Sequence, residues 1–281
     1  MTSLREVLRV SVQELKQAGI VSPQAQGRTI VSFVLGISPG EFPLVTAVND
    51  DQVAKVNQIV QQRLSGTPLQ HIIGTAPFRH SEVRVGPGVF IPRPETELLA
   101  GWAIDHIKED DKVVELCAGS GALSLAIHQE ASQCQQWAVE KSEDACVYLS
   151  DNLQGTPVEW VCSDMEFALP ELNGGVDVLV VNPPYLPLPP KPDGGDFPYD
   201  VLVDPWEALF AGDQGEDLFP VVARVARRLL KPGGVLGCEH GDDQSQIVSA
   251  IFSDHGFVHL SSHCDLNNRP RFITAMKPNM Q

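Results

Sequence analysis

From Lys112 onward, short apolar runs alternate with amphipathic segments, and this alternation limits the possible folds more than any other feature of the chain. Strands are expected at residues 112–116, 136–140, 158–162 and 176–181, with helices near 122–130 and 143–152. A further helix is expected at 218–230 and closing strands at 235–239, 257–261 and 272–276, with a Pro-Gly-Gly turn at 232–234. Strands alternating with helices predict an α/β fold, in which a parallel, doubly wound sheet carries helices on both faces.

A glycine-rich turn follows the first expected strand. Its residues are Cys117, Ala118, Gly119, Ser120 and Gly121. Ligands of open α/β sheets bind at the carboxyl ends of the strands, so this turn is a candidate binding loop. Glu140 ends the next strand, where a carboxylate can accept hydrogen bonds from ribose hydroxyls. The two features predict a nucleoside-containing cofactor. A turn whose glycines serve only backbone geometry is the alternative, because short glycine motifs are weak signals.

The details of the turn distinguish between nucleoside cofactors. A dinucleotide fingerprint needs a third small residue for close helix packing, and Ser124 stands at that position instead of glycine or alanine. Glu115, just before the turn, would repel a pyrophosphate but suits a cationic amino-acid cofactor such as S-adenosylmethionine, which carries an ammonium and a sulfonium. The turn therefore favours S-adenosylmethionine.

A second motif is expected at the same edge of the sheet. The apolar run 176–181 leads into Asn182-Pro183-Pro184-Tyr185. Proline fixes φ and lacks an N–H, so the corner is stiff. The Asn182 side-chain oxygen and the Pro183 carbonyl can accept both N–H bonds of a planar amide or amino group, and Tyr185 can pack on the flat substrate group. We interpret this corner as the catalytic and substrate-binding element.

The charge and length of the chain bear on its partners. Twenty Lys and Arg against 36 Asp and Glu give a net charge of −16, which disfavours a general DNA- or RNA-binding protein. The 281 residues predict about two domains. No apolar run is long enough for a membrane span, and no export signal is visible. Six dispersed cysteines without a Cys-x-x-Cys pair suggest neither a zinc ribbon nor a redox dithiol, so we expect a cytoplasmic protein.

The first part of the chain is predicted to form short helices. Ser3 and Glu6 make a capping-box pattern, and Ser22 with Pro23 looks like an N-cap followed by the first helical residue. A third amphipathic helix fits residues 51–64. Short alternating segments at 78–80 and 82–85 then predict a hairpin-like connector. Whether the helices are a structural cap or a partner-binding module stays open.

Two histidine-containing segments raise the question of a metal. Glu239-His240-Gly241-Asp242-Asp243 lacks the His-Glu-x-x-His spacing, so an acidic loop at a strand end is the preferred interpretation. His255 and His259 are separated by Gly256 and a probable turn. We predict no metal site.

The motifs together resemble a known family. Its characteristic segments are Asn182 to Tyr185, Glu115 to Gly121, Ile91-Pro92-Arg93-Pro94-Glu95-Thr96-Glu97 and Asp204-Pro205-Trp206-Glu207-Ala208-Leu209. In this order they are similar to the bacterial peptide chain release factor N5-glutamine methyltransferases (the PrmC/HemK family). The likeness covers most of the chain, including its helical start.

The resemblance implies a seven-stranded, Rossmann-like class I methyltransferase fold and S-adenosylmethionine as methyl donor, with S-adenosylhomocysteine as product. The substrate it implies is the glutamine of the Gly-Gly-Gln loop of release factors 1 and 2. By position, the cofactor would contact the turn 117–121, Glu140, Asp164, Met165 and Asn182, with Asp164 and Met165 beside the adenine. Asn182, Pro183, Pro184 and Tyr185 would hold the glutamine, and the expected catalytic residues are Asn182, Pro183 and Tyr185. The implied domains are 1–74 (helical, substrate-recognising), 75–95 (connector) and 96–281 (methyltransferase).

Two positions depart from the family pattern. Cys117 stands where many methyltransferases have glycine, and Met165 where the family often has an aromatic residue, so its contact with adenine would be softer and cofactor affinity lower. Arg93 in the connector has two open interpretations. It lines the groove or contacts the substrate loop, or it pairs with Glu95 or Glu97.

Three alternatives to the release-factor substrate remain. The core motifs also fit methylation of a ribosomal-protein glutamine. An adenine or guanine amino group, delivered by base flipping, suits the Asn-Pro-Pro-Tyr corner, although the acidic charge argues against it. A non-catalytic cofactor-binding protein belongs to another class, and an intact Asn182 argues against that interpretation.

Overall fold

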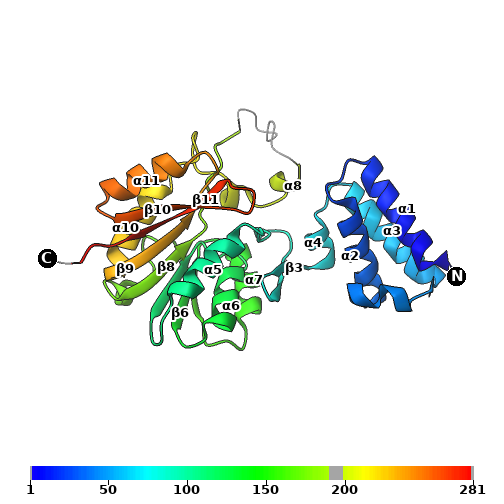
Figure 1. The fold of residues 1–281 in the computed structure, drawn as a ribbon, viewed down its shortest axis with the longest axis horizontal. Helices are drawn as coiled ribbons and strands as arrows, with labels where there is room; N and C mark the ends of the chain where they lie inside the picture. Colours follow the sequence, from blue (N-terminus) through cyan, green and yellow to red (C-terminus); the bar gives the residue numbers. More distant parts are fainter. Residues whose placement is uncertain (1, 190–198, 280–281) are drawn as a thin grey trace. The chain divides into compact units, whose positions relative to one another are not determined.

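The computed structural model describes residues 2–189 and 199–279, which form two compact units (Figure 1). The first unit runs to Gly74 and takes in the short stretch that ends at Val203. The second unit begins at Thr75 and resumes at Asp204. Within the described residues, no helix is both long enough and apolar enough to cross a bilayer.

The first unit is built from helices. They are α1 (Leu4–Gln17), α2 (Pro23–Leu35), α3 (Asp50–Leu64) and the short α4 (Leu69–Ile73), with a 3₁₀ turn η1 (Pro39–Leu44) and a two-residue strand pair β1 (Thr2–Ser3) and β2 (Ala47–Val48). Fully buried Leu15, Ile30 and Val56 come from three different helices and form a common core. The predicted helices are therefore confirmed.

The expected caps of this unit are only partly formed. Ser3 accepts the Glu6 N–H at 3.2 Å, but the Glu6 carboxylate binds Arg9 instead of closing the capping box. Ser22 was expected to be an N-cap, yet it adopts φ +52° and makes no side-chain cap bond, and α2 begins at Pro23. Both differences are local. Arg9, one turn later, competes for the Glu6 carboxylate. Proline at the first helical position has no N–H, so that position needs no hydrogen-bond acceptor.

A hairpin opens the second unit. Strands β3 (Thr75–Phe78) and β4 (Ser81–Arg84) pair antiparallel. The hairpin segments were predicted at 78–80 and 82–85, later in the chain than the observed strands. The difference arises because Arg79 (φ +51°) lies in the bend and not in a strand. Its guanidinium binds the Glu130 carboxylate at 2.6 Å through two nitrogens, which holds the hairpin against the helix that carries Glu130.

A seven-stranded sheet forms the centre of this unit. Its strands are β5 (Lys112–Leu116), β6 (Gln135–Glu140), β7 (Glu159–Cys162), β8 (Val176–Val181), β9 (Leu230–Glu239), β10 (Val258–Cys264) and β11 (Pro270–Met276). Their order is β10-β11-β9-β8-β5-β6-β7, and only β11 runs antiparallel to both of its neighbours. The predicted doubly wound, mostly parallel sheet is confirmed. The strand β9 is longer than predicted, because Pro232-Gly233-Gly234 is a bulge within it rather than a turn before it.

Helices cover both faces of the sheet (Figure 1). One face carries α5 (Thr96–His106), α6 (Ala122–Glu130) and α7 (Glu143–Leu153), and the other carries α10 (Phe219–Leu229) and α11 (Ser245–Asp254). The alternation along β5 explains why two helical layers are needed, since Val113 packs with the first layer and Val114 with the second. Two short helices, α8 (Tyr199–Leu202) and α9 (Trp206–Leu209), and the 3₁₀ turn η2 (Pro170–Leu172) lie in connections.

The order of the strands creates a switch point between β5 and β8. From β5 the chain proceeds outward through β6 and β7, then crosses back to β8 on the other side of β5. The connections that follow β5 and β8 run in opposite directions, and this opens a crevice at the carboxyl ends of the two strands. Ligands of α/β proteins bind in such crevices. The predicted glycine turn and Asn182 follow these two strands.

Candidate active site

The turn after β5 contains three residues with positive φ, and two of them are glycines. Gly119 and Gly121 adopt φ +55° and +77°, the left-handed region that favours glycine. A Cβ at Gly121 would lie 2.7 Å from Leu149 of α7, whereas no described atom lies within 4 Å of one at Gly119. The turn therefore packs against α7 at Gly121, whereas the space beside Gly119 is open and a ligand can approach there.

Cys117 also adopts a left-handed conformation, with φ +55°. Glycine adopts this conformation without strain, whereas a non-glycine residue there costs roughly 1–2 kcal/mol. Cys117 is partly buried. The pKa of its thiol is raised, because desolvation and the nearby carboxylates of Glu140 and Glu115 disfavour a thiolate. Cys117 is therefore a neutral, structural part of the turn.

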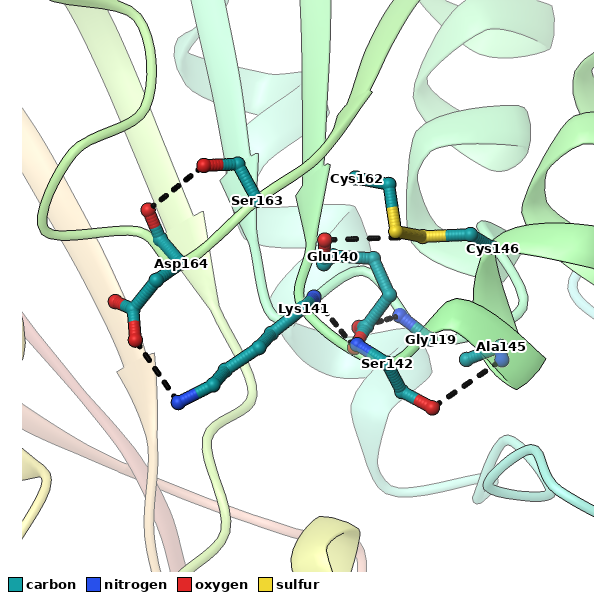
Figure 2. The surroundings of a disulfide bond; sticks show 9 residues. All are labelled: Gly119, Glu140, Lys141, Ser142, Ala145, Cys146, Cys162, Ser163 and Asp164. Carbon is teal, nitrogen blue, oxygen red and sulfur yellow. Dashed lines mark hydrogen bonds and ion pairs between the residues drawn. A yellow bond between two sulfur atoms is a disulfide. The ribbon is translucent and has the colours of Figure 1, made fainter.

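Glu140 ends β6 and faces the glycine turn (Figure 2). One of its carboxylate oxygens accepts the Gly119 N–H at 2.7 Å, and the other accepts the N–H groups of Lys141 and Ser142, both at 2.8 Å. The residue is partly exposed. Glu140 ends its strand as predicted, and these bonds hold its carboxylate beside Gly119. Its contact with a ribose stays a prediction.

Asp164 and Met165 follow β7 and differ in their surroundings. Asp164 is partly exposed, and its carboxylate binds the Lys141 ammonium at 2.9 Å (Figure 2). Hydrogen bonds from the Glu166 N–H and from Lys141 lower the pKa of Asp164. Met165 is 8% exposed and belongs to the main core cluster, while its carbonyl accepts a bond from Arg228. The Met165 side chain thus packs in the core of the sheet unit, and its contact with adenine stays a prediction.

Glu115 lies under the turn and does not reach its mouth. The residue is 6% exposed, and its carboxyl binds both the backbone N–H and the hydroxyl of Ser124 at the start of α6. Burial raises the pKa of Glu115 to about 8. Ser124, which replaces the third small residue of a dinucleotide fingerprint, is therefore used to hold this carboxyl.

Asn182 follows β8 across the switch point from the turn. Its Nδ2 donates to the Thr96 hydroxyl at 3.2 Å, at the start of α5. Among residues 2–189 and 199–279, no hydrogen bond reaches its Oδ1. The Asn182 carbonyl oxygen therefore has no partner among these residues, and its bond to a substrate stays a prediction.

Tyr185 is more buried than its predicted role suggests. Its hydroxyl donates to Glu239 Oε1 at 3.1 Å, at the end of β9, and burial together with the Glu239 charge raises the pKa of Tyr185. The ring packs against the main core cluster. The hydroxyl is thus anchored to the sheet, and whether the ring also packs on a substrate remains a prediction.

The Asn-Pro-Pro-Tyr corner is supported by two further segments. Gln244 donates through Nε2 to the Tyr185 carbonyl at 3.0 Å, and Leu186 pairs with Phe210. A Cβ at Gly215 would lie 2.2 Å from the Tyr185 carbonyl oxygen, so the loop that contains Gly215 passes directly over the corner.

The structure assigns Arg93 a partner that neither open interpretation named. Its guanidinium binds the Asp204 carboxylate, whose other oxygen accepts the Ile91 N–H at 3.1 Å. The Asp204 side chain is fully buried, whereas that of Arg93 is 31% exposed. The pairing with Glu95 or Glu97 was therefore wrong, and Arg93 joins the connector to the Asp-Pro-Trp-Glu-Ala-Leu segment.

Replacing Arg93 with alanine is expected to lower the free energy of unfolding by about 2 kcal/mol, because a buried carboxylate loses its cation. Lysine, which keeps the charge but not the planar fork, should recover part of the loss. Chemical denaturation measures both. Arg84→Ala is the matched control, because the Arg84–Asp151 pair is exposed and should contribute less than about 0.5 kcal/mol. Equal losses in the two alanine variants would contradict the prediction.

Thr96, Glu239 and Gln244 are site residues that the sequence analysis did not propose. Glu239 had been considered only as part of a possible metal loop, and in the described parts of the chain no group of three or more metal-ligating side chains comes together. The available signal was its position directly after the apolar run of β9, which ends at the same edge as β5 and β8. Thr96 and Gln244 lie at helix starts and carried no motif beyond the resemblance.

A disulfide joins Cys146 of α7 to Cys162 at the end of β7 (Figure 2). The Cys146 sulfur lies 3.7 Å from the Glu140 carbonyl oxygen. The dispersed cysteines had suggested no such pair, because the helical crossover that brings them together cannot be deduced from spacing. The bond connects the two elements that flank the strand carrying Glu140.

Reduction of the disulfide is expected to lower the free energy of unfolding by about 3 kcal/mol, since the bond closes a loop across a sequence separation of 16. Denaturation with and without reductant measures the difference. Thiol titration of the unfolded protein should give four free cysteines before reduction, namely Cys117, Cys134, Cys238 and Cys264, and six after it. Six thiols in protein purified without reductant would contradict the pairing.

The fold defines the class of protein. A seven-stranded sheet with the central order β6-β5-β8-β9, and with β11 inserted antiparallel beside β9, is the arrangement of the class I methyltransferases. The glycine turn, Glu140 and Asn182 lie at the switch point where this class binds its ligands.

Comparison with known proteins narrows the class to a family. The model for the PrmC N-terminal domain matches residues 6–74. A release factor glutamine methyltransferase of Streptomyces coelicolor is 43% identical over 98% of both chains, and one of Mycolicibacterium smegmatis is 38% identical over 99% of both. A 4-amino-L-phenylalanine/4-methylamino-L-phenylalanine methyltransferase of Streptomyces pristinaespiralis is 32% identical over 95% of this chain and 93% of its own. The chain belongs to the release factor glutamine methyltransferase family.

Proposed function

We propose that this enzyme transfers a methyl group from S-adenosylmethionine to the side-chain amide nitrogen of the glutamine in the Gly-Gly-Gln motif of release factors 1 and 2, and so supports translation termination. The observation that carries the proposal is Asn182, whose amide is bound on its nitrogen side by Thr96 while its oxygen is available at the switch point. The names of the full-length relatives support the same substrate.

The residues at the turn fit a nucleoside cofactor. Space above Gly119 admits a ligand, and three N–H groups occupy about three of the four lone-pair positions of the Glu140 carboxylate, which leaves one for a ribose hydroxyl. The turn 117–121 would hold the amino-acid part of the cofactor, and Asp164 and Met165 would lie beside the adenine. When bound, S-adenosylmethionine supplies an electrophilic methyl group, and S-adenosylhomocysteine remains as product. We propose no metal in the reaction.

The chain's own residues would act by positioning the substrate amide. Asn182 Oδ1 and the Pro183 carbonyl would accept its two N–H bonds and direct the nitrogen lone pair outward from the corner. These bonds strengthen as the nitrogen becomes positive, so they stabilise the transition state more than the ground state. Pro184 keeps the corner stiff, and the anchored Tyr185 fixes its far end.

The helical unit is the proposed recognition module for the release factor, in keeping with the match of its sequence to the PrmC N-terminal domain. Both proteins would meet in the cytoplasm. The net charge of −16 disfavours nucleic acid as a stable partner.

Mass spectrometry of purified release factor incubated with this enzyme and S-adenosylmethionine tests the proposal. We expect a gain of one methyl group on the glutamine of the Gly-Gly-Gln peptide, and no gain when that glutamine is replaced by asparagine. Cofactor binding by calorimetry without any methylation would overturn the release-factor assignment. Methylation of ribosomal proteins or RNA in the same assay would identify one of the alternative substrates.

A further inference from the structure

A buried amide side chain lies against the Asn-Pro-Pro-Tyr corner. Gln244 is 6% exposed and stands where the segment after β9 enters α11. Its backbone N–H donates to the Gly241 carbonyl at 3.0 Å, and its own carbonyl accepts the Val248 N–H at 3.0 Å in the first turn of α11. Val248 is fully buried in the main core cluster. The Gln244 side chain therefore extends toward the corner from a fixed backbone.

Both ends of this amide are hydrogen-bonded to backbone groups. The Oε1 atom accepts the Gly241 N–H at 2.8 Å. The Nε2 atom donates to the Tyr185 carbonyl at 3.0 Å and to the carbonyls of Gln214 and Gly215, both at 3.3 Å. A flipped amide would place its oxygen against three carbonyl oxygens, so these contacts settle its orientation. The amide thus links the corner, the loop at 214–215 and the start of α11.

The NH₂ group of Gln244 lies between three acceptors. All three carbonyl oxygens lie within 3.3 Å of its nitrogen. Their partial negative charges repel each other at short range unless N–H groups lie between them. Buried acceptors that lose their donor also destabilise the arrangement that holds them. Without these N–H groups, the corner and the loop at 214–215 would separate.

The segment from β9 to α11 holds Tyr185 at two points. Glu239, at the end of β9, accepts the Tyr185 hydroxyl at 3.1 Å. Gln244, at the other end of this segment, binds the carbonyl of the same residue. One bond fixes the side chain and the other fixes the peptide group. The peptide plane that ends the corner therefore has a defined orientation.

We propose that Gln244 is a positioning residue for methyl transfer, which fixes the peptide group at the end of the corner and thereby the two oxygens that accept the substrate N–H bonds. These oxygens belong to Asn182 and Pro183, so the inference rests on the proposed function. Pro183 and Pro184 have fixed φ angles, so a shift at Tyr185 is passed along the corner instead of being absorbed within it. Gln244 acts only through the corner.

The kinetics of a near-isosteric variant test this role. Gln244→Met fills about the same space and has no donor. With release factor and S-adenosylmethionine both saturating, we expect it to lower kcat about 10²-fold, the loss typical of a misplacement of about 1 Å. The Kd of S-adenosylmethionine, measured by calorimetry, should change far less. The turn 117–121 and Glu140 follow β5 and β6, whereas Gln244 follows β9.

A second variant serves if Gln244→Met does not fold. Gln244→Asn keeps the NH₂ group on a side chain that is one methylene shorter, so its nitrogen is withdrawn from the Tyr185 carbonyl while α11 stays in place. It should lower kcat in the same direction, again with little change in the Kd of S-adenosylmethionine.

Gln136→Met is the matched control. Gln136 is 7% exposed and lies near the start of β6, at the opposite end of the sheet from the corner, so the change removes an equally buried amide outside the site. It should lower the melting temperature, as Gln244→Met does, and keep the wild-type kcat. Equal losses of kcat in the two methionine variants would overturn the proposal, because general destabilisation would then explain both. A Gln244→Met enzyme with wild-type kcat would overturn it as well.

A further measurement needs no methyl acceptor and so separates this proposal from the substrate assignment. Tyr148 and Tyr185 are the two tyrosines that a leucine follows in the sequence. Protein made with tyrosine labelled with ¹³C at its carbonyl carbon and leucine labelled with ¹⁵N therefore gives two carbonyl–amide NMR signals. In Gln244→Met, the Tyr185 carbonyl signal should shift, whereas that of Tyr148 on α7 serves as an unshifted reference.

The two measurements together have distinct outcomes. A Tyr185 carbonyl signal that is the same in the wild type and in Gln244→Met contradicts the role of Gln244. A shifted signal with unchanged kcat shows that the bond exists but does not position the substrate, and this also overturns the proposal. A wild-type enzyme that leaves release factors unmethylated, while the signal shifts as expected in the variant, overturns only the substrate.

Discussion

Replacing Asn182 with alanine is expected to lower kcat for methyl transfer by about 10³, the loss typical for a preorganised group that acts on the developing charge of a transition state. The variant removes the oxygen proposed to accept a substrate N–H and leaves Thr96 without its donor. Affinity for S-adenosylmethionine should fall much less than kcat, since Asn182 is only one of the expected cofactor contacts and the turn 117–121 and Glu140 are untouched. Single-turnover kinetics followed by mass spectrometry, with calorimetry of cofactor binding, measure the two quantities separately.

A further variant defines what the loss means. Asn182→Asp keeps an acceptor oxygen but cannot donate to Thr96, so its kcat should lie between those of wild type and alanine. An Asn182→Ala enzyme that keeps more than a tenth of wild-type kcat would show that another group positions the substrate.

The sequence could predict the site where strand ends carry their own local signal. Residues 117–121 and Asn182 directly follow apolar runs, and parallel strands bring the ends of such runs to one edge. Glu140 follows the same rule on the neighbouring strand. These predictions needed only the apolar runs that mark strands and the alternation of strands with helices. Both are visible in the sequence between Lys112 and Asn182.

The residues behind the site could not be predicted in this way, because their contacts join distant parts of the chain. Thr96 meets Asn182 across 86 residues, and Arg93 meets Asp204 across 111. Which partner a charged side chain finds depends on the order of strands in the sheet, and nearby Glu95 and Glu97 were the plausible partners of Arg93 only along the sequence. Glu239 was on a predicted strand end, but the partner of its carboxylate, Tyr185, lies 54 residues away in the sequence.

Gly215→Ala is expected to lower the free energy of unfolding by about 4 kcal/mol. The residue has φ +73°, where a Cβ costs roughly 1–2 kcal/mol, and that Cβ would lie 2.2 Å from the Tyr185 carbonyl oxygen and 2.9 Å from backbone atoms of Leu186 and Pro187. Backbone atoms cannot rotate away as a flexible side chain can. The strain must be relieved by moving either the Gly215 loop or the Asn-Pro-Pro-Tyr corner, which adds about 2–3 kcal/mol.

Gly155→Ala separates the two contributions, because Gly155 has φ +81° and no described atom within 4 Å of its would-be Cβ. It should lose only the conformational part, about 1 kcal/mol. The difference between the variants then measures the clash alone. Because the corner carries Asn182, Gly215→Ala should also lower kcat below the level that its stability explains, when both variants are assayed well below their melting temperatures. Equal stabilities in the two variants would mean that the loop does not press on the corner, and the support proposed for Tyr185 would then rest on Gln244 and Glu239 alone.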